Sequence, residues 1–129
     1  MLTINIKKTS FIILTAKNKP IPDFVPPKIN NDTLQRSYEE KYLGLVIDDK
    51  LTWKPHIETV KSKLKAVLGA LYKAAHCIPK RVKPVIYNSL VKTHVDYLIE
   101  IWGSAASTNL LSLQKTQNKI IKVLYHFDY

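Results

Sequence analysis

The sequence predicts an α+β fold in which a small antiparallel β-sheet precedes a bundle of three helices. Runs of β-branched and aromatic residues separated by turn residues occur in residues 1–49, whereas apolar residues spaced three and four apart recur through 50–129. These are the signals of strands and of amphipathic helices respectively. The charge changes at the same point, because residues 1–49 carry seven Lys or Arg and six Asp or Glu, whereas 50–129 carry thirteen and four. We therefore expect two domains, 1–49 and 50–129.

Four segments of the first domain can be assigned in chain order. Residues 9–15 are rich in β-branched and aromatic side chains and predict a strand. Residues 17–27 contain four prolines, which predicts a loop because proline is excluded from central strands and helix interiors. The turn residues at 30–32 predict a short hairpin. Residues 41–48 are apolar almost throughout, which predicts a strand buried on both faces.

Three amphipathic helices are predicted in the second domain. The first follows Thr52 as a candidate N-cap and ends before Pro79, the second begins near Pro84 and ends at Gly103, and the third follows a short linker. Each helix has an apolar stripe that would face a common core. The stripes are Ile57, Val60, Leu64, Val67, Leu71 and Ala74; Ile86, Leu90, Thr93, His94, Tyr97 and Ile101; and Leu110, Leu113, Gln117, Ile120, Ile121 and Leu124.

The composition limits the classes of protein that the chain can represent. It has 129 residues, of which 46% are hydrophobic, so it can bury a core. Its one cysteine excludes an internal disulfide, which favours a reducing, intracellular compartment. No apolar run approaches the ~18 residues of a transmembrane helix, so no membrane partner is expected. The net charge of +10 favours an anionic partner such as nucleic acid or an acidic membrane.

No catalytic or metal-binding constellation is evident in the sequence. Divalent metal sites of polymerases and nucleases need carboxylates close together, and Asp48-Asp49 is the only adjacent aspartate pair. Because this pair ends a predicted strand, a turn or capping role is the favoured interpretation. Cys77 and His94 are interpreted as packing residues rather than ligands. We therefore expect no metal site and no self-contained enzyme in this chain.

The basic residues are the main candidates for function. Cations on the first helix and on the loop after it could neutralise phosphates and release counterions. The alternative is an ordinary solvated helix face. Trp53 and Trp102 could stack on bases, but packing at the ends of the bundle is the favoured interpretation. The candidate nucleic-acid-binding residues are Lys54, Lys61, Lys65, Lys73, Lys80, Arg81 and Lys83.

Several short motifs follow one another along the chain. They are Lys41-Tyr42-Leu43-Gly44-Leu45-Val46-Ile47-Asp48, Leu51-Thr52-Trp53-Lys54, His56-Ile57, Tyr87-Asn88-Ser89-Leu90-Val91, His94-Val95-Asp96-Tyr97, Ile101-Trp102-Gly103 and Gln117-Asn118-Lys119. This ordered set resembles the C-terminal part of the reverse transcriptases of non-LTR retrotransposons, the LINE-type and jockey-like elements. Residues 2–11 are also similar to the segment that follows the catalytic aspartates in that family. The resemblance covers nearly the whole chain.

The resemblance implies a role for each part of the chain. Residues 1–49 would be the last segment of a polymerase palm, and 50–129 would be a helical thumb that grips the RNA/DNA template–primer duplex. Tyr42, Leu43 and Gly44 match the primer grip, where a residue without Cβ lets a nucleic-acid strand approach. A bulge in an ordinary strand is the alternative for Gly44. Lys8 matches a lysine near the departing pyrophosphate, with a merely exposed lysine as the alternative.

The departures from the family pattern limit what this chain can do alone. The metal-binding aspartates of the family lie upstream of its matching segment, so Mg²⁺ is implied only for the full-length parent enzyme. We expect the chain alone to be catalytically inactive. The rest of the palm and the fingers, which this chain lacks, are expected to be its protein partners. Leu98 stands where the family usually has glycine. The alternatives are a free-standing basic helical module that binds nucleic acid, and a non-functional remnant of a mobile element.

The missing palm also leads to an expectation about stability. The strands predicted at 9–15 and 41–48 would pair with upstream palm strands, so their edges would be open in this chain. We therefore expect residues 1–49 to be poorly packed when the chain is expressed alone, while the helical bundle over 52–126 remains folded.

Overall fold

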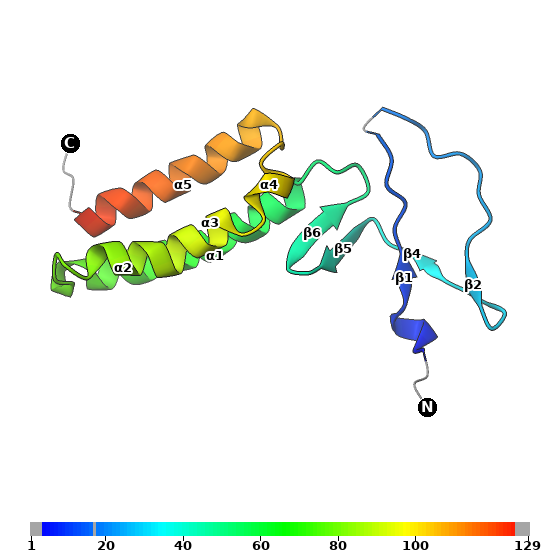
Figure 1. Ribbon diagram of the computed structural model, residues 1–129, viewed down its shortest axis with the longest axis horizontal. Coiled ribbons are helices and arrows are strands. Elements are labelled where there is room, and N and C mark those ends of the chain that lie inside the picture. Colours follow the sequence, from blue (N-terminus) through cyan, green and yellow to red (C-terminus); the bar gives the residue numbers. More distant parts are fainter. Residues whose placement is uncertain (1–3, 17, 126–129) are drawn as a thin grey trace. The chain divides into compact units, whose positions relative to one another are not determined.

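The computed structural model describes residues 4–16 and 18–125. Lys17 of the predicted loop, residues 2–3 of the motif segment and residue 126 of the predicted bundle lie outside the described residues. The chain forms two compact units, Met1–Trp53 and Lys54–Tyr129. Short strand pairs occupy the first unit and the long helices occupy the second (Figure 1). The α+β class is thus confirmed, whereas the assignment of the units to a palm and a thumb stays a prediction.

The described residues of the first unit form three pairs of short strands. The predicted hairpin around residues 30–32 is confirmed, and residues 18–27 contain no helix or strand. The strand predicted over 9–15 is reduced to two residues, and it pairs in parallel rather than antiparallel. A 3₁₀ turn, η1 (Ile6–Lys8), precedes the strands. The pairs are β1 (Ser10–Phe11) with β4 (Gln35–Arg36), β2 (Lys28–Ile29) with β3 (Asp32–Thr33), and β5 (Glu39–Tyr42) with β6 (Leu45–Asp48).

The predicted buried strand over 41–48 is wrong, because this segment contains the turn of the antiparallel β5–β6 hairpin. Leu43 has a φ of 47° and Gly44 a φ of 83°, and positive φ at both central residues defines a type I′ turn. Leu43 is 69% exposed at the tip, whereas Leu45 is 4% exposed. The apolar pattern predicted a continuous strand here because it gives no indication that a leucine occupies a turn. The turn conformation of Gly44, rather than a bulge, is the reason that glycine stands at this position.

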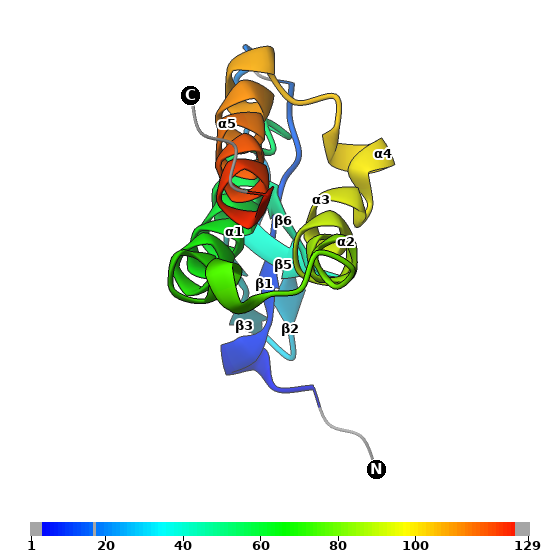
Figure 2. The same cartoon turned by 90° about the vertical axis from the view of Figure 1, so that its left-hand side faces the viewer.

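The second unit is built on two long helices that pack against each other, α1 (Lys54–Ala74) and α5 (Ser107–Tyr125). Figure 2 views α1 and α2 nearly end-on, with α5 beside α1. The largest fully buried side chains among the described residues lie in this unit, namely Trp102, Ile57, Leu64, Ile120, Leu124 and Val91. The elements between the long helices are η2 (Ala75–Cys77), α2 (Lys83–Tyr87), the π-helix η3 (Asn88–Lys92), α3 (Thr93–Asp96) and α4 (Ile99–Trp102).

The apolar stripes predicted for α1 and α5 are confirmed in most positions. Ile57, Val60, Leu64 and Leu71 are buried in α1, but Ala74 is exposed and Ala75 is buried in its place. In α5 the predicted residues Leu113, Ile120 and Leu124 are buried together with Thr116, which the apolar pattern omits. Cys77 is exposed, so its interpretation as a packing residue is wrong. None of the described helices is both long and apolar enough to cross a membrane.

The second predicted helix is interrupted twice, so a bundle of three continuous helices is not confirmed. The π-helix η3 shifts the helical register, and Leu98 then adopts a left-handed conformation with φ 51°. The predicted stripe is consequently wrong at Leu90, Tyr97 and Ile101, which are 45–50% exposed, and at Thr93, which is also exposed. Val91 and Trp102 are buried at 0% and 1% exposure in their place. Glycine would adopt the conformation of Leu98 without strain.

Candidate nucleic-acid interface

A buried carboxylate organises the turn that ends the first unit. Asp48 Oδ2 accepts hydrogen bonds from the backbone N–H of Thr52 at 2.9 Å and from its hydroxyl at 2.8 Å. Asp48 Oδ1 accepts one from the backbone N–H of Trp53 at 2.9 Å. Burial alone would raise the pKa of Asp48, but these hydrogen bonds outweigh it and lower the pKa below 3.8. The turn role expected for this aspartate is confirmed.

The two aspartates at this turn have partners within the protein. Both carboxylate oxygens of Asp48 are engaged by the turn, and Asp49 lies 3.8 Å from the guanidinium of Arg36. Within residues 4–16 and 18–125, no three His, Cys, Asp or Glu side chains come together to hold a metal ion.

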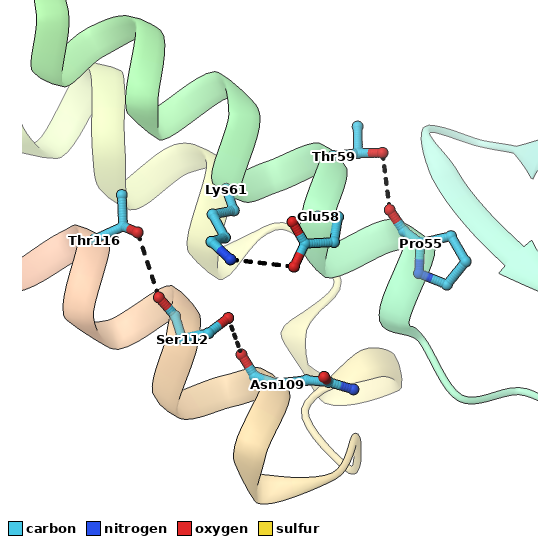
Figure 3. A network of polar contacts seen from close by, with 7 residues as sticks. All are labelled: Pro55, Glu58, Thr59, Lys61, Asn109, Ser112 and Thr116. Atoms are coloured by element: carbon cyan, nitrogen blue, oxygen red, sulfur yellow. Dashed lines mark hydrogen bonds and ion pairs between the residues drawn. The ribbon is translucent and has the colours of Figure 1, made fainter.

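Three candidate lysines share one stripe of α1. Lys54, Lys61 and Lys65 are seven and four residues apart, so the helix places them on the same side. Lys54 and Lys65 are exposed, and Lys61 is half-buried. The ammonium of Lys61 lies 3.1 Å from Glu58 Oε1, one turn earlier on α1 (Figure 3). These three lysines therefore form one cationic stripe along α1.

The other candidate cations lie apart from that stripe. Lys73 is exposed on another side of α1, and Lys80 and Arg81 are exposed in the turn between η2 and α2. Lys83 is only 6% exposed, with its Nζ 6.0 Å from the ring centroid of Tyr125. The structure therefore does not present Lys83 on the surface, whereas five of the other candidates are exposed and Lys61 is half-buried.

The residues matched to the primer grip lie at the tip of the β5–β6 hairpin in the first unit. Tyr42 and Leu43 are 64% and 69% exposed, and Gly44 completes the turn. A large apolar residue in the left-handed region is unusual and marks a backbone position held against its preference. Lys8 is exposed at the end of η1.

The aromatic candidate Trp102 belongs to the core. It is 1% exposed, its indole N–H donates to the carbonyl of Tyr97 at 2.8 Å, and its ring lies 5.5 Å from that of His56. This confirms the packing interpretation rather than base stacking. His56 is 3% exposed, and burial, with a smaller effect of Lys63, lowers its pKa below 6.5. The sequence analysis names His56 only within a family motif and does not predict its burial, although it directly precedes Ile57 of the predicted stripe.

Two of the motifs that carry the family resemblance meet in the second unit. Gln117 Nε2 on α5 donates a 2.6 Å hydrogen bond to the hydroxyl of Tyr87 at the end of α2. The two residues are half-buried, and they link α5 to the interrupted helical segment. No pattern within either motif indicates this contact, because the two residues are 30 positions apart.

The chain is similar in sequence to RNA-directed DNA polymerases of mobile elements, as its motifs predict. It is 25% identical over 124 positions to the "Probable RNA-directed DNA polymerase from transposon X-element" of Drosophila melanogaster. It is 28% identical over 128 positions to the "RNA-directed DNA polymerase from mobile element jockey" of Drosophila funebris. It is 27% identical over 132 positions to the "Probable RNA-directed DNA polymerase from transposon BS" of Drosophila melanogaster.

These matches span most of this chain but a small part of each relative. They cover 94%, 94% and 100% of the chain, and 13%, 13% and 14% of the respective polymerases. The resemblance to retrotransposon reverse transcriptases is thereby confirmed, and the matching region is a small segment of each of these relatives. No family model matches the chain. No solved structure matches it significantly.

Proposed function

We propose that this chain acts as part of an RNA-directed DNA polymerase and that its helical unit holds the backbone of the template–primer duplex. The observation that carries the proposal is the stripe of Lys54, Lys61 and Lys65 on α1. Similarity to mobile-element polymerases over nearly the whole chain supports it. The remainder of the polymerase would supply the catalytic aspartates and their Mg²⁺ ions.

The lysine stripe suits a polymerase because lysines contact phosphate charges rather than particular bases. Lys61 and Lys65 are four residues apart, about 6 Å along the helix axis. Duplex DNA carries about one charge per 1.7 Å of its axis, so each ammonium can meet a different phosphate. Phosphate contacts fix the position of a protein on a duplex without reading its bases. A polymerase must hold template–primer of any sequence, and this kind of contact provides that.

The exposed tip of the β5–β6 hairpin supports a second contact, with the primer strand. A left-handed, non-glycine residue costs on the order of 1–2 kcal/mol, and such strain is concentrated at functional positions. Leu43 carries this cost while it is 69% exposed, so packing within the described unit accounts for little of its retention. We propose that Tyr42, Leu43 and Gly44 contact the primer. Lys8 would lie near the departing pyrophosphate in the complete polymerase, a role that rests on the resemblance alone.

A salt titration tests the proposal on the chain as it stands. Fluorescence anisotropy would measure the affinity for a labelled RNA–DNA template–primer between 50 and 200 mM KCl. We expect the logarithm of affinity to fall linearly with the logarithm of salt, by about 0.9 per phosphate contact. The triple variant Lys54→Glu, Lys61→Glu, Lys65→Glu should flatten that slope by about three units.

The matched control reverses three lysines outside the candidate set, Lys28→Glu, Lys63→Glu and Lys92→Glu. It changes the net charge equally, and circular dichroism would verify that both variants remain helical. Equal slopes for the two triple variants, or affinity that does not depend on salt, would contradict the proposed role of α1.

A further inference from the structure

The lysine stripe of α1 continues to an exposed tyrosine. Successive residues of an α-helix turn by about 100°, so residues four and seven apart share a side. Lys65 follows Lys61 by four residues, and Tyr72 follows Lys65 by seven, which places the three on one stripe. Tyr72 is 65% exposed. Gly69 lies between Lys65 and Tyr72 on the stripe, and a Cβ there would meet no heavy atom within 4 Å apart from its chain neighbours and the nearby backbone of its own helix.

Helix α5 brings a second stripe of cations to the same side. Figure 3 shows Lys61 on the side of α1 that faces the first turns of α5, where Ser112 lies. Lys115 and Lys119 follow Ser112 by three and seven residues, so they continue its stripe, and both are exposed. The two helices pack together and run in the same direction (Figure 1). The two stripes therefore advance together along the outer side of the contact between α1 and α5, here called the α1–α5 seam.

The α1–α5 seam is almost without negative charge. Helix α5 contains three lysines and neither Asp nor Glu, and Glu58 is the only acidic residue of α1. Glu58 is engaged by Lys61 at 3.1 Å. Within the described residues, no ion pair involves Lys65, Lys115 or Lys119. Cations that are exposed and without a nearby carboxylate attract phosphate most effectively.

We infer that a nucleic-acid strand lies along the α1–α5 seam, with its phosphates shared between Lys65 on α1 and Lys115 and Lys119 on α5, and with an unpaired base stacked on Tyr72. This inference rests on the proposed function and extends it in two respects. It adds two residues of α5 to the phosphate contacts. It also assigns the end of the seam to single-stranded nucleic acid.

The exposure of Tyr72 determines which form of nucleic acid fits. Aromatic side chains stack on bases of any identity, but in a duplex the faces of the bases are covered by their neighbours. An exposed tyrosine at the end of a phosphate-binding stripe therefore fits a base that extends beyond the paired region. The uncovered helix surface at Gly69 leaves room for the strand to pass between Lys65 and Tyr72.

The phosphate contacts of α5 are tested by the double variant Lys115→Glu, Lys119→Glu. Two lost contacts should lower the slope of log affinity against log salt by about two units and weaken binding at 100 mM KCl by about tenfold or more. The matched control Lys28→Glu, Lys63→Glu has the same net charge. If the wild-type chain binds but the two double variants bind equally well, the inference about α5 is wrong and the proposed function stands. If the wild-type chain shows no salt-dependent binding, the proposed function itself is wrong.

The stacking contact is tested with two probes, a blunt RNA–DNA duplex and the same duplex with a single-stranded template overhang. Tyr72→Ala should weaken binding to the overhang probe by about five- to 150-fold, which corresponds to one stacked base. It should leave binding to the blunt duplex unchanged within about twofold, and Tyr72→Phe should retain the overhang affinity. Alanine favours the helix, so loss of fold is not expected. Equal effects of Tyr72→Ala on the two probes, or none on either, would overturn the inference.

Discussion

Replacing Leu43 by asparagine should stabilise the β5–β6 hairpin. Leu43 has a φ of 47° and precedes Gly44 with φ 83°, and Asn-Gly is a preferred pair for this turn. A left-handed leucine costs about 1–2 kcal/mol. Leu43 is 69% exposed, so its replacement loses about a third of the 1.5–3 kcal/mol of a fully buried leucine, or roughly 0.5–1 kcal/mol. We expect a net stabilisation of about 0.5–1 kcal/mol.

The variant Leu43→Ala is the matched control, because it loses the same side-chain contacts but keeps the left-handed backbone cost. The two variants should therefore differ by about 1–2 kcal/mol. Amide hydrogen exchange of the ladder between Lys41 and Val46 would measure this difference locally. Exchange should be slowest for Leu43→Asn and fastest for Leu43→Ala. Equal exchange in these two variants would refute the assignment of strain to Leu43.

Three further predictions concern the primer contact, the pH dependence and the two units. Leu43→Asn should weaken template–primer binding in anisotropy while it stabilises the hairpin; unchanged affinity would contradict the primer contact. Because the pKa of His56 is lowered in the folded state, the free energy of unfolding should have its full value above pH 6.5. It should fall as the pH drops through the lowered pKa of the folded state, and urea midpoints at pH 7.5 and 5 would show this. His56→Phe should reduce this dependence, and an unchanged difference would exclude His56 as its source. Residues 4–49 should exchange amide hydrogens faster than 54–125, because their ladders are short and their edges open; uniform protection would contradict this.

The buried turn carboxylate gives a fifth prediction. Asp48→Asn should destabilise the first unit by about 1–3 kcal/mol, because an amide cannot accept all the hydrogen bonds from Thr52 and Trp53. In the wild-type chain the contribution of Asp48 should be complete above pH 3.8 and lost as the pH falls through its lowered folded pKa. Urea unfolding at pH 7 and pH 3 would measure both effects. Equal stability of the variant and the wild type at pH 7 would contradict the role of this carboxylate.

The hairpin turns at Asn30-Asn31 and at Leu43-Gly44 differ in how well the sequence predicts them. Asn30 and Asn31 occupy left-handed positions with φ 48° and 69°, and asparagine tolerates that region, so the turn was predictable. Leu43 occupies the same region against its own preference. Its apolar side chain made the segment resemble a continuous strand, and only the tertiary structure reveals the reversal.

The helices show the same limit in another form. The stripes of α1 and α5 were predictable because regular helices keep a period of 3.6 residues. The segment 83–102 loses that period at the π-helix and again at Leu98, so residues at the expected spacing are exposed while Val91 and Trp102 are buried. A local shift of the helical register, such as the one at the π-helix, cannot be predicted from composition or periodicity.

The candidate interface was predictable only where it lies on one regular helix. Lys61 and Lys65 share a stripe that their spacing alone defines. The burial of Lys83 against Tyr125 depends on how a later helix packs, which spacing cannot give. The same applies to Lys115 and Lys119, whose place beside α1 follows from the packing of α5.

The most direct test of the polymerase assignment is to sequence the transcript and the genomic DNA upstream of the codon for Met1. An in-frame aromatic-x-Asp-Asp motif a short distance upstream is the predicted result, and it would supply the metal-binding carboxylates that the described residues do not form. A stop codon or an unrelated sequence directly upstream would contradict the assignment. The chain would then be a free-standing basic module or a remnant of a mobile element, and the salt titration would distinguish between these two.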